Sequence, residues 1–177
     1  CIVAHGGLQW LEMTAYQWMA DFPLALCALY LSYRWGFLRS FSVSLLAVLH
    51  FSFLWLGLSM TLYAVQSPVY MLSGHLLFGL APSHALAIGF FASMVLAMAS
   101  RVTIGHSGRP LELDHTTWLL FLGFQSAAVL RILADLIPAM APMLYVAAGL
   151  AWLGCFVLWA AKYAPIYWRQ RVDGKPG

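Results

Sequence analysis

Long runs of apolar residues alternate with short polar connections along the chain. An α-helix rises about 1.5 Å per residue, so roughly 20 apolar residues cross the hydrocarbon core of a bilayer. These runs are apolar on all sides of a helix, whereas a helix of a water-soluble protein shows one apolar stripe. The sequence therefore predicts an all-α, polytopic transmembrane helix bundle with about five spans. The spans are Trp18 to Trp35, Phe41 to Val65, Ser83 to Arg101, Thr117 to Pro138 and Pro142 to Tyr163.

The connection from Gln66 to Pro82 is rich in residues that interrupt helices. Pro68, Gly74 and Gly79 argue against another full crossing. We expect a short interfacial helix around Met71 to Leu80 instead.

Composition supports a lipid environment. Of the 177 residues, 63% are hydrophobic and 8% are charged, and the mean hydropathy is +0.82. A soluble domain carries about 25% charged residues, so this chain has too few to cover a surface in water. The net charge of +3 does not indicate nucleic-acid binding, because the basic residues sit at the ends of the spans. The three cysteines imply no disulfide framework, and the sequence lacks the motifs of common hydrolases and phosphate loops.

Basic residues predict the orientation of the bundle. The connections after the first and third spans and the C-terminal region hold eight of the nine Lys and Arg residues. Cytoplasmic flanks carry the excess of positive charge, so these segments are expected to face the cytoplasm. We thus expect one transmembrane domain over 1–177 with a cytoplasmic tail at 164–177. The eight residues are Arg34, Arg39, Arg101, Arg109, Lys162, Arg169, Arg171 and Lys175.

Three ionisable residues lie at membrane depth, where each costs about 2.5–3.5 kcal/mol on insertion scales. His50, nine residues into the second predicted span, either hydrogen-bonds to a neighbouring helix or ligates a metal or haem. Arg131 and Asp135 are four residues apart and share one helix face. They form an ion pair that fixes helix packing, or Arg131 holds an anionic group such as a haem propionate or a substrate.

Two further histidines flank the third span, with His84 at its outer end and His106 just past its inner end. An unbroken helix holds them about 33 Å apart, too far to share a metal ion. His84 also lies roughly 13 Å above His50, which argues against one haem with both as axial ligands. Met94 and Met98 share a face of this span and either pack against other helices or offer soft ligands to Cu(I).

The stretch after the third span reads Arg101-Val-Thr-Ile-Gly-His-Ser-Gly-Arg-Pro-Leu111. Two glycines and a proline interrupt the helix there, so His106 and Arg109 are presented at the cytoplasmic boundary. By itself, this pattern fits a positively charged turn at the membrane surface.

Together with His84-Ala-Leu-Ala-Ile-Gly89 at the head of the same span, this string resembles the NnrS family of membrane proteins. The likeness is close over Ser83 to Leu111, and Leu49-His50 followed by Trp55 is also similar. The resemblance implies a protein of the bacterial cytoplasmic (inner) membrane that binds b-type haem and copper. It also implies a role in the response to nitric oxide, in denitrification or in defence against nitrosative stress. Family members are longer than this chain, which we therefore expect to be the C-terminal part of the protein.

The leading hypothesis is a haem- and copper-binding membrane protein with His50 and His84 as metal ligands. Arg131 would steady a haem propionate, and His106 and Arg109 complete the expected cofactor-binding residues. The expected partners are the lipid bilayer and either nitric oxide or a redox partner. No catalytic residue is assigned, and a redox role is compatible with the sequence.

Two other hypotheses come from different classes of protein. A transporter or efflux component would use Arg131, Asp135 and His50 to line a polar path through the membrane. A membrane anchor or assembly subunit without chemistry would use the stretch from Gly105 to Leu111 as a simple turn.

Overall fold

Helices form most of residues 1–174, the part of the chain that the computed structural model describes. No strand occurs in that part, so the predicted all-α fold is confirmed. The α-helices are α1 (Ile2–Trp10), α2 (Trp18–Arg34), α3 (Phe37–Ser40), α4 (Ser44–Ser73), α5 (Ala81–His84), α6 (Ser93–His106), α7 (His115–Leu136) and α8 (Ala141–Tyr163). The other helical segments are η1 (Thr14–Tyr16), the π-helical η2 (Ala85–Ala92), η3 (Pro138–Met140) and η4 (Ala164–Trp168).

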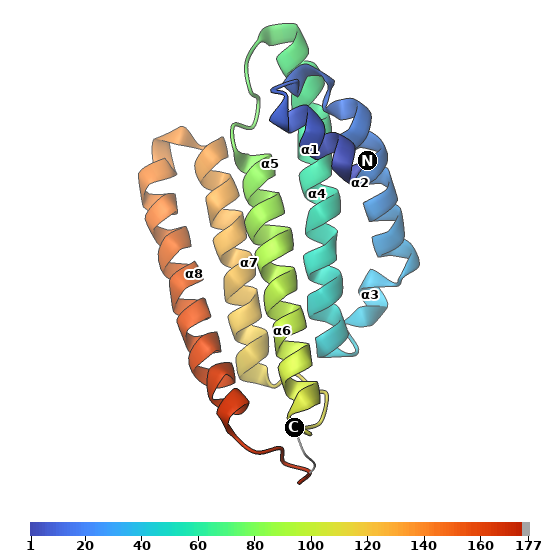
Figure 1. Cartoon of the computed structure of the whole chain (residues 1–177). Helices are drawn as coiled ribbons and strands as arrows, with labels where there is room; N and C mark the ends of the chain where they lie inside the picture. Colours follow the sequence, from blue (N-terminus) through green and yellow to red (C-terminus); the bar gives the residue numbers. More distant parts are fainter. Residues whose placement is uncertain (175–177) are drawn as a thin grey trace.

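Helical segments long and apolar enough to cross a membrane make this a multi-pass membrane protein. In residues 1–174 they are Ser44–Ser73, Ala81–His106, His115–Leu136 and Pro138–Trp168. The first predicted span forms α2, a helix of 17 residues. Its length is about 25 Å at 1.5 Å per residue, slightly less than the hydrocarbon thickness. It packs along α4 (Figure 1).

α4 is longer than the sequence predicted. The expected end at Val65 and the separate helix around Met71 to Leu80 are both wrong, because one helix runs on to Ser73. Pro68 lies inside this helix. Membrane helices tolerate an internal proline where neighbouring groups satisfy the freed backbone carbonyls. The helix ends at Gly74, whose φ of 70° is the left-handed conformation that favours glycine.

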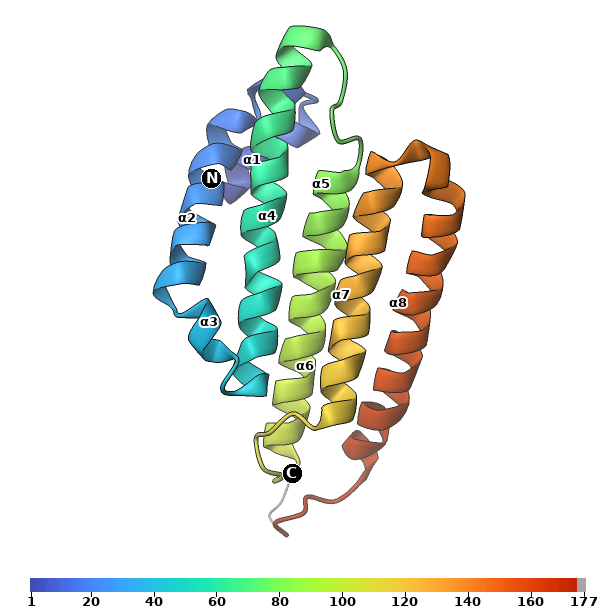
Figure 2. The ribbon, with the colours of Figure 1, turned by 180° about the vertical axis from the view of Figure 1, so that it is seen from behind.

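The long helices lie side by side and alternate in direction (Figures 1 and 2). α4 lies between α2 and the helix formed by α5, η2 and α6, and α7 packs against both that helix and α8. α8 leaves large apolar side chains such as Leu150, Leu153 and Leu158 exposed. Exposed leucines spread along a helix of this length indicate contact with lipid.

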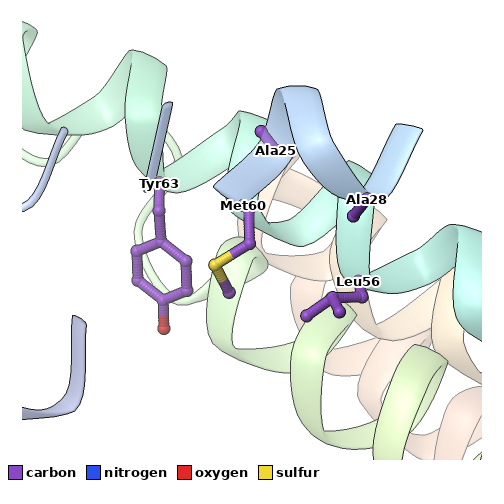
Figure 3. Packing of buried hydrophobic residues seen from close by; sticks show 5 residues of the cluster. All are labelled: Ala25, Ala28, Leu56, Met60 and Tyr63. Atoms are coloured by element: carbon purple, nitrogen blue, oxygen red, sulfur yellow. The ribbon is translucent and has the colours of Figure 1, made fainter. Parts of the chain in front are cut away.

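Small residues let α2 approach α4 closely. Ala25 and Ala28 on α2 are buried against Leu56, Met60 and Tyr63 on α4 (Figure 3). In membranes, helix association depends on such close packing because lipid tails are as apolar as the helices. This contact fixes the position of Tyr63, which contributes to the site described below.

The two ends of the bundle differ in charge. α3, the α6–α7 connection and the C-terminal end of α8 lie at one end, which we call the basic end (Figure 1). α1, the α4–α5 connection and the α7–α8 connection lie at the other end, which we call the opposite end (Figure 1). Lys175, which the sequence placed with the basic residues, lies outside the described residues. The basic end carries Arg34, Arg39, Arg101, Arg109, Lys162, Arg169 and Arg171.

Candidate functional site

His84 and Asp135 form a hydrogen-bonded pair between two helices near the opposite end. The Nδ1 atom of His84 lies 2.6 Å from Oδ2 of Asp135, although the residues are 51 positions apart. Their side chains are 17% and 6% exposed. A carboxylate accepts hydrogen bonds, so Nδ1 of His84 is the donor, and in the neutral ring Nε2 then carries the lone pair. Tyr145 donates a second hydrogen bond of 3.3 Å to the same carboxylate.

Contacts with α4 fix the point at which His84 enters the bundle. The carbonyl of Pro82 accepts a hydrogen bond of 2.8 Å from the hydroxyl of Ser59. The hydroxyl of Ser83 lies 2.7 Å from that of Tyr63. The π-helical segment η2 begins directly after His84, and π-helical turns occur frequently at functional sites.

The ion pair between Arg131 and Asp135, one of the two alternatives that the sequence left open, does not form. Asp135 pairs with His84 instead, and the guanidinium carbon of Arg131 lies 4.0 Å from the ring centre of Tyr145 on α8. A cation over an aromatic ring is stabilised by the ring's electrons without a carboxylate partner. A spacing of four residues brings two side chains within reach, but side chains from other helices compete for both.

A second pair of the same kind, His5 and Asp21, was not predicted from the sequence. The Nδ1 atom of His5 on α1 lies 2.6 Å from Oδ1 of Asp21 on α2, and both side chains are buried. Within residues 1–174, Nε2 of His5 and Oδ2 of Asp21 are buried atoms without a hydrogen-bond partner. One signal was present in the sequence: an acidic residue, Asp21, inside the first apolar span. Its partner lies outside that span, where local pattern does not indicate burial.

Tyr63 lies between the two histidine–aspartate pairs. Its ring meets the His5 ring edge to face, with 4.8 Å between ring centres. Its hydroxyl bonds to Ser83, the residue that precedes His84. The two pairs, His5 with Asp21 and His84 with Asp135, therefore lie at the same end of the bundle. They come from α1, α2, α5 and α7, and Tyr63 on α4 lies between them. This cluster is the candidate functional site.

His50 lies apart from this cluster. Val48 belongs to a core cluster with Leu96, and Trp55 lies against Gly89. His50 therefore lies between these levels, near the middle of the Ala81–His106 helix, whereas His84 lies near its beginning. The His50 side chain is half-buried, and within residues 1–174 its ring has no hydrogen-bond partner.

A buried polar network accounts for two other residues of the motifs, Trp55 and Gly89. Trp55 donates a hydrogen bond of 2.7 Å to Gln125, which donates one of 2.9 Å to Ser93. A Cβ atom on Gly89 would lie 2.5 Å from the Trp55 ring. Gly89 is thus needed for the indole to reach Gln125, and the network joins α4, α6 and α7.

His106 is the last residue of α6, and Arg109 follows in the α6–α7 connection. That connection lies at the basic end, whereas α5, which ends with His84, lies toward the opposite end (Figure 1). His106 is exposed, and its Nδ1 lies 2.9 Å from the carbonyl of Val102. It borders a cavity of about 380 Å³ together with Tyr167, Arg169 and Arg171. His106 therefore does not share a site with His84. This separation agrees with the sequence analysis, which placed the two histidines too far apart to share a metal ion.

The loop after His106 provides a docking surface for the C-terminal segment. The N–H of Val172 donates a hydrogen bond of 3.0 Å to the carbonyl of Ser107. Gly108 has φ 73°, and a Cβ there would lie 2.8 Å from the carboxyl carbon of Asp173. The glycine of this motif is therefore required by backbone conformation and by close approach.

Arg109 is half-buried and borders a cavity of about 330 Å³ that Asp114 and Lys162 also line. Asp114 accepts hydrogen bonds from Lys162 and, at 2.9 Å, from the N–H of Thr117, and so caps α7. Burial of the carboxyl tends to raise its pKa, but the hydrogen bonds from Lys162 and Thr117 outweigh this effect. The pKa of Asp114 is thereby lowered from 3.8 to about 2.

The donor groups favour one type of metal centre over another. Among residues 1–174, no group of three or more His, Cys, Asp or Glu side chains is placed to hold a metal ion. A haem iron needs just one or two protein ligands, because the porphyrin supplies the others. Ligating histidines usually donate their other ring N–H to a carboxylate, and His84 has this arrangement. The residues present therefore fit axial ligation of haem better than a complete copper site.

The comparison with protein families agrees with these motifs. The sequence profile of the family described as NnrS protein matches residues 1–171. No curated protein and no solved structure matches the chain. The match spans both histidine–aspartate pairs, the Trp55 network and the loop after His106. The chain belongs to the NnrS family of membrane proteins.

Proposed function

We propose that this chain binds b-type haem through the Nε2 atom of His84 and takes part in the response to nitric oxide. The observation that carries the proposal is the hydrogen bond from His84 to the nearly buried carboxylate of Asp135. Membership of the NnrS family supports the choice of haem and nitric oxide. A bound haem would supply an iron atom able to bind a small diatomic ligand.

Asp135 would act as a positioning residue for this ligand. A carboxylate that accepts from Nδ1 fixes the tautomer and the ring orientation of a ligating histidine and raises its basicity. Tyr145 holds Asp135 from α8, so the orientation of His84 depends on three helices. Such support keeps the ligating atom in place when it is not bonded to a metal.

Arg131 is suited to bind a haem propionate. Its guanidinium group has no carboxylate partner within 4.0 Å among residues 1–174 and lies on Tyr145, next to Asp135. A guanidinium group matches the geometry of a carboxylate with two parallel hydrogen bonds. We propose that it fixes the orientation of the haem edge near the opposite end.

Copper binding is also proposed, on the basis of the family alone. His50 is the candidate ligand that we propose, and its half-buried ring has no hydrogen-bond partner in residues 1–174. A copper site would need further donors besides His50, and His106 and Arg109 lie at the basic end, where they do not meet it.

The orientation in the membrane follows from the charge difference between the ends. We propose that the basic end and the C-terminal tail face the cytoplasm of a bacterial inner membrane. The haem site near the opposite end would then lie toward the periplasmic side. Reporter fusions after Trp168 and in the α4–α5 connection test this, and activity of a periplasmic reporter after Trp168 would contradict it.

The function is tested on the full-length protein purified from cells supplied with haem and copper. We expect a Soret absorption band, haem and copper in the metal analysis, and a shift of the band when nitric oxide is added. A colourless, metal-free and monodisperse preparation would rule out the proposed function.

A further inference from the structure

We propose that the cavity between the end of α6 and the C-terminal segment binds the phosphate group of an anionic phospholipid. The cavity has a volume of about 380 Å³, and His106, Tyr167, Arg169 and Arg171 border it. It lies at the basic end, whereas the haem site proposed above lies near the opposite end. The proposal therefore gives a binding role to the loop after His106, which the haem site does not include.

The first observation is the charge around this cavity. Two arginines line it, and none of its described lining residues is acidic. Arg171 is held by Asp173, whose carboxylate accepts hydrogen bonds of 2.9 Å from Nε and 2.7 Å from Nη2. Arg169 is exposed and has no carboxylate within 4.0 Å among residues 1–174. Its guanidinium group is thus available to donate two parallel hydrogen bonds to a phosphate group.

The second observation is that contacts on both sides anchor the segment with the two arginines. Before them, the hydroxyl of Tyr167 lies 2.6 Å from that of Thr103 on α6. After them, the N–H of Val172 donates a hydrogen bond of 3.0 Å to the carbonyl of Ser107. The segment thus turns back from α8 to the end of α6 (Figures 1 and 2). Its basic groups are therefore positioned before a ligand binds.

The third observation is the position of the cavity relative to the membrane. Tyr167 and Trp168 are 68% and 82% exposed, and exposed aromatic residues beside a membrane span are typical of the headgroup level. Val102 and Ile166 give the cavity an apolar wall, and Val102 is exposed on the Ala81–His106 span. Basic pockets between membrane helices bind the headgroups of anionic lipids. The combination of basic groups and an apolar wall favours a phospholipid over a soluble anion.

The neighbouring cavity beside Arg109 has a different balance of charge. It has a volume of about 330 Å³, and Glu112 and Asp114 line it together with Arg109 and Lys162. Asp114 accepts a hydrogen bond from Lys162. Carboxylates of the protein already occupy this cavity, so we expect the phosphate group beside Arg169 and not beside Arg109.

A general attraction between the basic end and an anionic membrane makes a different prediction. Such an attraction depends on charge and distance alone, so each exposed arginine at this end would contribute alike. In a defined site, Arg169 would contribute more than an exposed arginine outside the cavity. Arg101 provides this comparison, because it is exposed on α6 and is not among the described residues that line the cavity.

The test uses the full-length protein in an uncharged detergent, followed by native mass spectrometry. It is titrated with phosphatidylglycerol and, separately, with the zwitterionic phosphatidylcholine. We expect the wild type to bind phosphatidylglycerol in preference to phosphatidylcholine. Arg169→Gln should weaken the binding of phosphatidylglycerol about fivefold, the contribution of one basic residue near an anionic lipid surface. Arg101→Gln is the matched control and should bind this lipid as tightly as the wild type.

Several results would overturn the inference. A wild type without preference for phosphatidylglycerol would do so whether or not the variants accumulate. Unchanged affinity in Arg169→Gln would place the lipid elsewhere, and equal losses in Arg169→Gln and Arg101→Gln would show a general attraction. Displacement of the lipid by inorganic phosphate, but not by chloride at equal ionic strength, would show a site for a soluble anion. Selective lipid binding by a wild type that lacks haem would instead contradict the proposed function and support this inference.

Discussion

The imidazole of His84 and the carboxylate of Asp135 lie 2.6 Å apart between α5 and α7. Both side chains are largely buried, and each satisfies the hydrogen-bonding capacity of the other. The pair joins two helices that are distant in sequence. Because Asp135 occupies Nδ1, the geometry leaves Nε2 as the reactive nitrogen of His84.

Replacing Asp135 with Asn should weaken haem binding without abolishing it. The amide can still contact Nδ1, but it no longer raises the basicity of the ring. Loss of such an outer partner typically costs about 10–100-fold in metal affinity. The measurement is haem retention by the purified full-length variant against a competing haem-binding protein. Glu112→Gln, an exposed change at the basic end, is the control, and equal retention in both variants would contradict the role of Asp135.

Replacing Gly89 with Ala should destabilise the bundle. The added Cβ would lie 2.5 Å from the Trp55 ring, and overpacking of a well-packed interior costs about 1–3 kcal/mol. Gly149→Ala is a matched control, because a Cβ there meets nothing within 4 Å. Unfolding in a denaturing detergent titration gives the free-energy difference. The contact would be refuted if both variants unfolded at the same detergent fraction.

Trp55 and Gln125 should be energetically coupled. Gln125→Leu leaves the buried indole N–H without its acceptor, and a buried unsatisfied group costs about 1–3 kcal/mol. Trp55→Phe removes the donor, so the double variant should be less destabilised than the sum of the single variants. A double-mutant cycle in the same titration measures the coupling. Strict additivity would show that the 2.7 Å hydrogen bond contributes nothing.

Asp114 should stabilise the basic end in a pH-dependent way. Its pKa is lowered from 3.8 to about 2, because the hydrogen bonds from Lys162 and Thr117 outweigh the effect of burial. A folded-state pKa below the unfolded value gives a contribution that is fully present above pH 3.8 and is lost as the pH falls toward 2. The stability difference between the wild type and Asp114→Asn should therefore shrink as the pH falls from 3.8 to about 2. A difference that is constant over this range would contradict the ion pair.

The long helices could be predicted from the sequence because hydropathy and length decide them locally. The error at the end of α4 came from treating proline as a helix breaker, which is less reliable for a helix in a membrane. Pro68 lies within α4, since a membrane helix accommodates a proline when its neighbours compensate the backbone. The helix thus ends at Gly74, which has a positive φ, and not before Pro68.

The site was predicted less completely, because its contacts join residues far apart in sequence. Spacing along α7 predicted a partner for Asp135 on its own helix, but a histidine 51 residues away takes that place. His5 and Asp21 are 16 residues apart on different helices. Neither pairing leaves a periodic pattern, and both depend on which helices are neighbours. His84, Trp55 and Gly89 were identified because the family motif contains them.

The most direct measurement is the optical absorption spectrum of the purified full-length protein carrying His84→Ala, recorded beside the wild type and His75→Ala, which replaces an exposed histidine in the α4–α5 connection. We predict that the Soret band of His84→Ala is lost or clearly shifted, and that His75→Ala matches the wild type. A folded His84→Ala protein with a wild-type band and full haem content would contradict the assignment of His84 as a haem ligand.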